Sequence, residues 1–545
     1  MTINKSTIES LVNNKNEKSL LLILLLFSYF TKIINTDYIF DGTDIPWHVL
    51  SGLRLHHTSV LDFTYLGNNF FGQLIQNSHG YSMQFLTWLL YELSFNILKI
   101  SINETNIIKI HSLFSIFTLI PVYLFFKKNL GIKKSLLLVL IISLLPAHIA
   151  YSRSATGPLN ISVCFFFLSL YSLDNLIKNY NNKNIFKYSL SVFFYIGSSN
   201  IFILGIIFNF IYILLNEEKI NYKIIKNIFV KYYINSISFF LIIFPIIGYM
   251  CVTIFSISYG IEQGYILRLI SKGQDISFNP FKILKLVEYI GPIFFLSIYC
   301  YIRLFKNERL KKINLFFLIY FIIYLFLITI SNVDSGYYLF LATPIAYFII
   351  KKITKKNISL VGLFLILNLA YSLSYVYSIP YSFSNENSVS RTIIGAYSSK
   401  KNFDRGQKTL AYLIRKNILK VPIIIKKDSF FEEIEIYNIA SDIDGMTYYL
   451  NKKFIHTNSK KIKIDKDTII IYAKKNVVLS GIIKKNNLNL LMEICSNNKI
   501  ILKIYSSAKL NTKKIRCFDT KIYNKKFENS FKTFNDFGQP YLGQF

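Results

Sequence analysis

The residues best suited to chemistry lie close together near the N-terminus, in the string Asp41-Gly-Thr-Asp44-Ile-Pro-Trp-His48. Asp44 and His48 are four residues apart, so a helix that contains both would present them on one face. A carboxylate in this setting can act as a general base, and the histidine can orient a substrate or bind a metal ion. An aspartate directly before a helix is also a common N-cap, so Asp44 has a structural interpretation as well. Asp62, farther along the same stretch, is a third acidic candidate.

Apolar segments surround this string. The chain of 545 residues is 52% apolar and only 17% charged, and the charge is concentrated after Pro380. A soluble domain holds about 25% charged residues, whereas a membrane-spanning helix needs about 20 mostly apolar residues. About eleven segments fit this description: Leu20–Ile34, Ile108–Phe126, Leu136–Tyr151, Leu159–Leu173, Tyr188–Ile196, Ile201–Leu215, Ile234–Phe255, Val287–Leu304, Leu315–Ile330, Tyr337–Ile350 and Leu360–Tyr377.

Basic residues predict the orientation of these spans. The formal net charge of +32 does not indicate nucleic acid, because the lysines and arginines before Pro380 form short clusters in alternate connections, as the positive-inside rule predicts. We expect an integral membrane protein, in a bacterial inner membrane, with a cytoplasmic N-terminus. Residues 1–378 then form the transmembrane domain, with a long first outside loop at 35–107 and further outside loops near 153–158 and 256–286. Residues 379–545 form an outside domain.

Three strings in this order resemble a known family. The first is Asp44-Ile-Pro-Trp-His48 in the first outside loop, and the second is Ser152-Arg-Ser-Ala-Thr-Gly157 at the second outside connection. The third is Gly336-Tyr-Tyr-Leu-Phe-Leu-Ala-Thr-Pro344. Together they resemble the GT-C membrane glycosyltransferases, which include the oligosaccharyltransferase catalytic subunit, protein mannosyltransferases and aminoarabinose transferases.

The resemblance implies a fold and a reaction. The fold is a polytopic α-helical membrane protein of about 11 transmembrane helices, GT-C-like, with a C-terminal extracytoplasmic α/β domain. The reaction is the transfer of a sugar from a polyprenyl-phosphate donor to an extracytoplasmic lipid, glycan or protein. Asp44, or alternatively Asp41, would be the catalytic carboxylate. Arg153 would bind the donor phosphate, helped by Arg268 or Lys272.

The sequence also departs from the family. His48, Asp62 and Asn160 are candidates for binding the acceptor or a divalent cation such as Mg²⁺ or Mn²⁺. In oligosaccharyltransferases an acidic D-x-E pair follows the second string and helps to hold that metal, but Asn160 and Ser162 stand at these positions, which argues against it. The third string lacks the arginine of the family. A W-W-D motif for the acceptor sequon is excluded, since Trp47 and Trp88 are the only tryptophans. We therefore do not expect N-glycosylation.

The C-terminal region has a mixed pattern. Asp404 is placed to cap a helix, and Val421–Ile425 reads as a buried strand. Short β runs follow at Thr468–Ala473, Val477–Ile483, Leu488–Ile494 and Ile500–Tyr505. Cys495 and Cys517 lie in this region and could form a disulfide or remain free.

Two other functions stay open. A transporter or flippase of a lipid-linked molecule would have polar or broken helices in the membrane, often in two related halves. A non-catalytic membrane scaffold would use the outside domain to bind a partner, which would leave the acidic first loop without a role.

Overall fold

The computed structural model describes two parts of the chain. In the helical part these are residues 16–34, 81–100, 104–153, 158–198, 202–217, 221–248, 250–251, 285–307, 312–330, 338–353 and 358–375. In the C-terminal third they are residues 433–434, 437–438, 453–454, 469–473, 484–485, 487–496, 499–506 and 515–519. The chain divides into two compact units, of which the first comprises Met1–Thr36, Phe71–Thr87 and Ile108–Lys400 and the second holds the rest.

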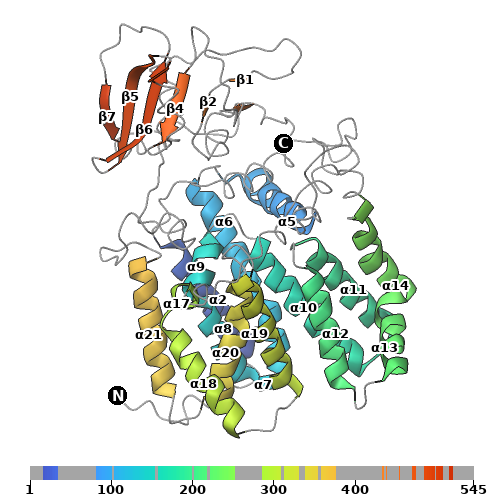
Figure 1. The fold of residues 1–545 in the computed structure, drawn as a ribbon. Coiled ribbons are helices and arrows are strands. Elements are labelled where there is room, and N and C mark those ends of the chain that lie inside the picture. The colour runs from blue at the N-terminus through green and yellow to red at the C-terminus, as the bar shows by residue number, and fades with distance from the viewer. Residues whose placement is uncertain are drawn as a thin grey trace. The chain divides into compact units, whose positions relative to one another are not determined.

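Most of the first half of the helical part follows the predicted apolar segments (Figure 1), but two of its helices, Tyr81–Tyr91 and Glu92–Ile97, lie within the predicted first outside loop at 35–107. Its helices are α2 (Glu17–Ile33), α5 (Tyr81–Tyr91), η1 (Glu92–Ile97), α6 (Glu104–Phe117), α7 (Leu119–Leu130), α8 (Ile132–Ser143), α9 (Pro146–Arg153) and α10 (Pro158–Lys178). Gly131 separates α7 from α8 with a φ of 79°, a left-handed conformation that glycine adopts without steric cost. The predicted span Leu136–Tyr151 is therefore two helices, because Pro146 has no N–H to continue α8.

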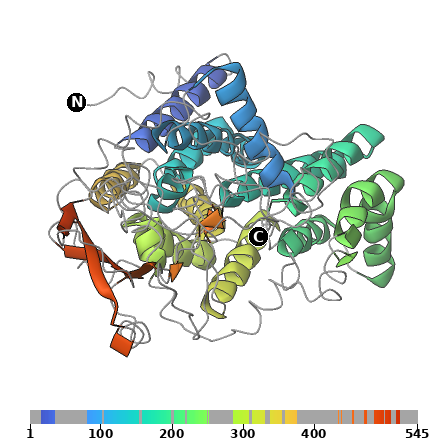
Figure 2. The same cartoon turned by 90° about the horizontal axis from the view of Figure 1, so that it is seen from above.

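A second group of helices contains a sharp bend. It comprises α11 (Asn182–Ile196), α12 (Phe202–Asn216), α13 (Tyr222–Phe229), η2 (Val230–Ile234), α14 (Ser236–Ser238) and η3 (Phe239–Ile243). The helical runs Tyr222–Ile234 and Ser236–Gly248 meet at 62°. Asn235 starts the second run, since its side chain accepts a hydrogen bond from the Ser238 backbone N–H. Seen from above, this bent pair lies at the edge of the bundle, in green, opposite α21 (Ile358–Tyr375), in gold (Figure 2).

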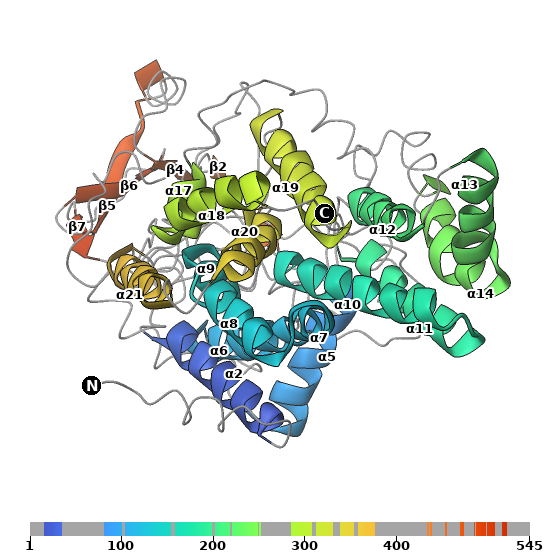
Figure 3. The same ribbon diagram turned by 90° about the horizontal axis from the view of Figure 1, so that it is seen from below.

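The last helices enclose the core of the helical unit. They are α17 (Lys285–Ile290), α18 (Ile293–Asn307), α19 (Lys312–Ile330), α20 (Tyr338–Lys352) and α21. Seen from below, α20 lies between α18, α19, α8 and α10 (Figure 3), and it packs against all four. Its residues 340–350 are all buried. The predicted span Val287–Leu304 is interrupted at Gly291–Pro292, where α17 ends and α18 begins.

The helical unit has an apolar exterior. On α2, Leu22, Ile23 and Phe30 are each more than half exposed, and Phe326 on α19 and Ile366 on α21 are similar. Among the described residues, three helices are long and apolar enough to cross a membrane, Thr105–Leu130, Ile161–Lys178 and Lys312–Thr329, and the bent pair is a fourth candidate. Large exposed apolar side chains of this kind are typical of a surface in contact with lipid.

One end of the bundle gathers basic residues. Lys127 on α7 contacts the Glu17 carboxylate at the start of α2 at 2.6 Å. Lys128 contacts Asp174 near the end of α10 at 3.1 Å, and Lys312 at the start of α19 donates to the Asn216 carbonyl at the end of α12. These contacts place several of the lysine-rich connections at one end, which we call the Glu17 end. The opposite end, near Lys32 on α2, is called the Lys32 end.

The C-terminal unit contains a small mixed sheet. Its strands are β1 (Glu433–Ile434), β2 (Tyr437–Asn438), β3 (Lys453–Phe454), β4 (Ile469–Ala473), β5 (Asn489–Ser496), β6 (Lys499–Ser506) and β7 (Ile515–Asp519). Five of them form a sheet in the order β2-β4-β6-β5-β7, with β6 antiparallel to both neighbours. The predicted strands at 468–473, 488–494 and 500–505 are confirmed. The helix after Asp404 and the strands at 421–425 and 477–483 lie outside the described residues.

The sheet buries one face. Met492 and Ile494 on β5 are buried, as is Ile504 on β6, which pairs with Met492. Alternate residues of β5 therefore form the packed face, as the period of two predicts. Cys495 and Cys517 lie on β5 and β7, which are parallel neighbours. Disulfide formation between them stays a prediction.

Candidate functional site

Most residues of the predicted site lie outside the described part of the chain: Asp41, Asp44, His48, Asp62, Arg268 and Lys272. Of the other two, Arg153 is the last residue of α9 and Asn160 lies in the first turn of α10. The structure thus defines the helices that carry Arg153 and Asn160 and those that border the loops. The candidate site is built from these helices.

A buried lysine lies beside the break between α8 and α9. The Lys32 side chain comes from the last turn of α2 and is completely buried. Its ammonium donates to the Ser28 hydroxyl at 2.8 Å, to the Ser28 carbonyl at 3.2 Å and to the Ser143 carbonyl at 3.3 Å. Ser143 is the final residue of α8. Ionisable groups inside a membrane bundle are energetically costly and usually functional. The sequence analysis did not single out Lys32, because this residue lies near the end of the predicted apolar span Leu20–Ile34.

Polar side chains continue from this lysine along α9. The Ser152 hydroxyl donates to the His148 carbonyl one turn earlier and lies 3.4 Å from His148 Nδ1. At the end of α9, the Ser152 carbonyl accepts a hydrogen bond from the Ser112 hydroxyl of α6 at 3.3 Å. All three side chains are buried. The predicted string beginning at Ser152 thus starts inside a buried polar cluster that joins α6 and α9.

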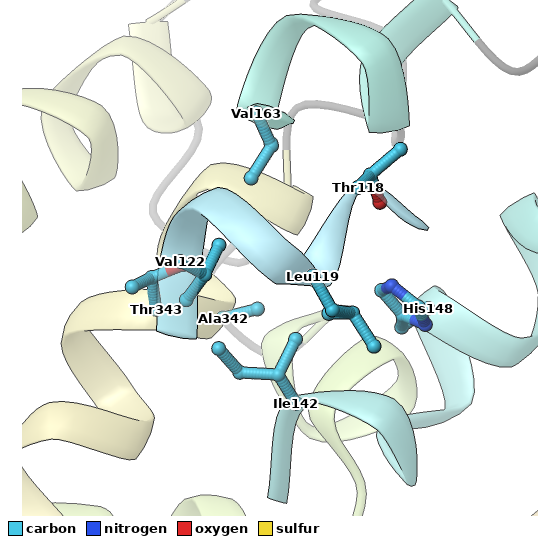
Figure 4. Close-up of a pocket in the computed structure, with 8 residues that line it drawn as sticks. All are labelled: Thr118, Leu119, Val122, Ile142, His148, Val163, Ala342 and Thr343. Carbon is cyan, nitrogen blue, oxygen red and sulfur yellow. The ribbon is translucent and has the colours of Figure 1, made fainter. Parts of the chain in front are cut away.

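A small cavity opens beside His148 (Figure 4). It is lined by Thr118, Leu119, Val122, Ile142, His148, Val163, Ala342 and Thr343. Its volume of about 10 Å³ is the space needed by a single water molecule. The Thr343 hydroxyl is buried without a hydrogen-bond partner. This cavity suits an ordered water and is far too small for a sugar.

A second helix break lies next to α9. Gly291, with a φ of 80°, and Pro292 separate α17 from α18. The buried Asn368 side chain of α21 bridges the gap, because its Oδ1 accepts from the Ile293 N–H at 3.0 Å and its Nδ2 donates to the Ile290 carbonyl at 2.9 Å. Helix α17 packs against α9. The end of α9, which carries Arg153, and the start of α17, which follows the loop with Arg268 and Lys272, therefore belong to a pair of packed helices.

Chain length places this cluster at the end of the bundle opposite Glu17. Glu17 and Lys32 are fifteen residues apart on α2, which is about 22 Å along a helix. Ser112 and Lys127 are also fifteen residues apart, on α6 and α7, and Ser112 belongs to the polar cluster whereas Lys127 contacts Glu17. The breaks in the helices and the buried lysine thus share the Lys32 end.

Of the two positions that argue against a metal site, Asn160 and Ser162, the second has other contacts. The Ser162 hydroxyl on α10 is buried and donates to the Ser198 carbonyl. Nearby, the Ser82 N–H at the start of α5 donates to the Gly197 carbonyl. Within the described ranges, no group of three or more His, Cys, Asp or Glu side chains is close enough to hold a metal ion.

No protein-family model matches the sequence, and no protein with a curated description does. Solved structures, in contrast, share the fold over most of the chain. One of them is ArnT, the aminoarabinose transferase, from Cupriavidus metallidurans. In the apo state ArnT matches with a TM-score of 0.54 and 10% identity, over 90% of this chain and 97% of ArnT.

The same protein bound to undecaprenyl phosphate matches with a TM-score of 0.56 and 10% identity, over 91% of this chain and 99% of that one. A weaker likeness, with a TM-score of 0.48 and 14% identity, is to an oligosaccharyltransferase from Archaeoglobus fulgidus, over 82% of this chain and 65% of that one. These matches confirm the predicted resemblance to an aminoarabinose transferase at the level of the fold, a mostly helical architecture with apolar helices.

Proposed function

We propose that this protein is a membrane glycosyltransferase that moves a sugar from a polyprenyl-phosphate donor to an extracytoplasmic acceptor. The observation that carries the proposal is the shared fold over 91% of the chain with ArnT, a protein solved with undecaprenyl phosphate bound. The three strings found in the sequence in the family's order support the same reaction. The acceptor would be a lipid, a glycan or a protein.

The proposed chemistry takes place at the Lys32 end. An acceptor hydroxyl attacks the anomeric carbon, the bond from that carbon to the phosphate oxygen breaks, and the polyprenyl phosphate leaves with the bonding electrons. Asp44, or alternatively Asp41, takes the proton from the hydroxyl. Cationic side chains neutralise the charge that grows on the phosphate.

Arg153, Arg268 and Lys272 are the proposed phosphate-binding residues. The packing of α9 against α17 supports this assignment, because the helix that carries Arg153 lies against the helix that follows the predicted 256–286 loop. His48 and Asp62 are proposed to orient the acceptor. Asn160, in the first turn of α10, is proposed for the same role.

We do not expect a tightly bound divalent cation to be required. Asn160 and Ser162 replace the acidic pair of the oligosaccharyltransferases, and the Ser162 hydroxyl is engaged with the Ser198 carbonyl. Transfer should therefore continue after treatment with EDTA, and adding Mg²⁺ or Mn²⁺ should not increase it. Loss of transfer in EDTA, restored by either ion, would contradict this expectation.

The proposed topology follows the basic residues. The Glu17 end, which gathers lysines, faces the cytoplasm of a bacterial cell, and the Lys32 end faces outward. The region 379–545 is then extracytoplasmic, and we propose that it covers or assists the membrane site rather than carrying the catalytic group.

Reconstitution tests the function directly. The purified protein is placed in lipid vesicles with polyprenyl-phosphate sugars. Transfer is measured for the wild type, Asp44→Asn, Asp41→Asn and the control Asp334→Asn, an acid between the predicted spans Leu315–Ile330 and Tyr337–Ile350. We expect Asp44→Asn to lose transfer and Asp334→Asn to retain it. Unchanged transfer in both Asp44→Asn and Asp41→Asn would overturn the assignment of the catalytic carboxylate.

A flippase is the second candidate, and the two helix breaks favour it, since transporters often have interrupted helices near their binding sites. The breaks at Ser143–Pro146 and Gly291–Pro292 lie on packed helices, as such a site would require. A fluorescent lipid-phosphate sugar that crosses the bilayer in these vesicles, without transfer of its sugar, would favour transport over transfer.

A further inference from the structure

We propose that Lys32 is a positioning residue: it caps the C-terminus of α8 and so fixes the direction in which α9 leaves the break and carries Arg153 toward the donor phosphate. The capping role stands on the contacts of Lys32 alone. The consequence for the donor rests on the proposed function.

The need for a cap arises at Pro146. A helix leaves its last carbonyls without intrahelical partners, and a proline four residues after Ile142 removes the N–H that would have continued α8. The N–H groups of Leu144 and Leu145 turn back onto carbonyls of the last turn, at Leu140, Ile141 and Ile142. The Ser143 carbonyl instead accepts from Lys32. A cation at this position also offsets the negative end of the helix dipole.

The three N–H bonds of Lys32 are all engaged. An ammonium has three donors and no acceptor, and the two Ser28 oxygens and the Ser143 carbonyl accept all of them. No donor is left for a phosphate oxygen in this arrangement. Lys32 therefore acts on the donor through the helix that it caps, and a direct contact with phosphate would require these bonds to break.

Side chains from other helices hold the chain on both sides of the break and at the end of α9. Lys32 holds the end of α8 through the Ser143 carbonyl, three residues before α9 begins, and the Ser112 hydroxyl holds the last turn of α9 through the Ser152 carbonyl. Between these points α9 packs against α2, α17 and α21. Releasing the end of α8 would loosen the point from which α9 starts, and with it the position of Arg153 at the end of α9.

Hydrogen exchange tests the cap without any assumption about function. Lys32→Met keeps the length of the side chain but has no donor, whereas Ser28→Ala removes one acceptor and leaves the contact with Ser143. We expect amide exchange over residues 144–153 to accelerate by about tenfold in Lys32→Met, as for a helix that has lost its anchoring contacts. Exchange in α19 should stay unchanged, and Ser28→Ala should resemble the wild type.

Wild-type exchange over residues 144–153 in Lys32→Met would overturn the cap. If Lys32→Met does not accumulate, Lys32→Gln replaces it, because its shorter amide still has donors but reaches less far. In Lys32→Gln, amide exchange over residues 144–153 that is faster than in the wild type supports the proposal. Exchange at the wild-type rate refutes it. Ser112→Ala, which releases the other end of α9, should accelerate exchange near Ser152 only.

Donor kinetics test the positioning step in the reconstituted transfer assay. We expect Lys32→Met to raise the KM for the lipid-linked donor by about tenfold, the factor that corresponds to a loss of 1.4 kcal/mol in binding. The acceptor KM should not change. A role confined to overall stability would lower kcat and leave the donor KM unchanged, which would overturn the positioning step.

The two tests also separate the possible failures. A raised donor KM together with wild-type exchange in α9 would indicate a direct phosphate contact and refute the positioning role. An absence of transfer in the wild type with every donor would refute the proposed function, while the exchange measurement would still decide whether Lys32 caps α8.

Discussion

Replacing Asn368 with alanine removes both hydrogen bonds that bridge the break between α17 and α18. The Asn368 side chain is fully buried, with its oxygen 3.0 Å from the Ile293 nitrogen and its nitrogen 2.9 Å from the Ile290 oxygen. Alanine leaves one backbone donor and one backbone acceptor without partners in a dry interior. Each such group costs about 1–3 kcal/mol, and hydrogen bonds inside membranes lie toward the lower end of this range.

We therefore expect Asn368→Ala to lower the free energy of unfolding by about 2–4 kcal/mol. Asn368→Asp keeps the acceptor but loses the donor to Ile290 and buries a charge, so it should be at least as harmful. Leu367→Ala is the matched control, because Leu367 is the neighbouring residue on α21 and is 42% exposed. Unfolding is followed by circular dichroism during denaturant titration in mixed detergent micelles.

A double-mutant cycle that combines Gly291→Ala with Asn368→Ala tests the same contact. A Cβ atom at Gly291 would lie 2.7 Å from Asn368 Oδ1, and the φ of 80° would be strained for alanine. Gly291→Ala should destabilise the wild type more than it destabilises Asn368→Ala, since the clash disappears with the amide. Additive effects in this cycle, or a loss below about 0.5 kcal/mol in Asn368→Ala, would refute the bridging role.

Two further predictions concern the helical unit. Gly205→Ala should destabilise the protein, because its Cβ would lie 2.1 Å from the Tyr195 ring, and Tyr195→Leu should reduce the loss measured in the same unfolding assay. The hydrogen bond from Lys127 lowers the pKa of Glu17 below its ordinary value of 4.5, so its stabilisation is present above that pH and is lost as the pH falls through the lowered pKa. The difference in melting temperature between wild type and Glu17→Gln should disappear on acidification; a constant difference would contradict this.

Much of the helical architecture could be predicted from the sequence. Apolar runs of helical length predicted α2, α10, α19, α20 and α21, because a helix that crosses a membrane needs a continuous run of apolar residues in the sequence. The lysine clusters predicted a common end, and the contacts of Lys127 and Lys128 place two of those connections together. The strands β4, β5 and β6 were predicted from short β runs.

The helix breaks were harder to predict. Pro146 lies in the sequence as a visible signal, as do Gly291 and Pro292, yet each stood inside an apolar run and the runs were read as continuous spans. A proline shows where a helix can end. Whether the helix breaks there depends on a side chain that forms hydrogen bonds with the freed backbone groups, and that side chain comes from a distant part of the chain.

The sequence by itself determined that this is a polytopic membrane protein, the order of its helices, and the chemistry that residues such as Asp44 and Arg153 would supply. Only the tertiary structure decided how the breaks are held. Lys32 meets Ser143 across 111 residues of sequence, and Asn368 meets Ile290 across 78. Local periodicity sets which face of a helix is apolar. It carries no information on which distant helix packs there, and that packing is what pairs a buried polar side chain with its partner.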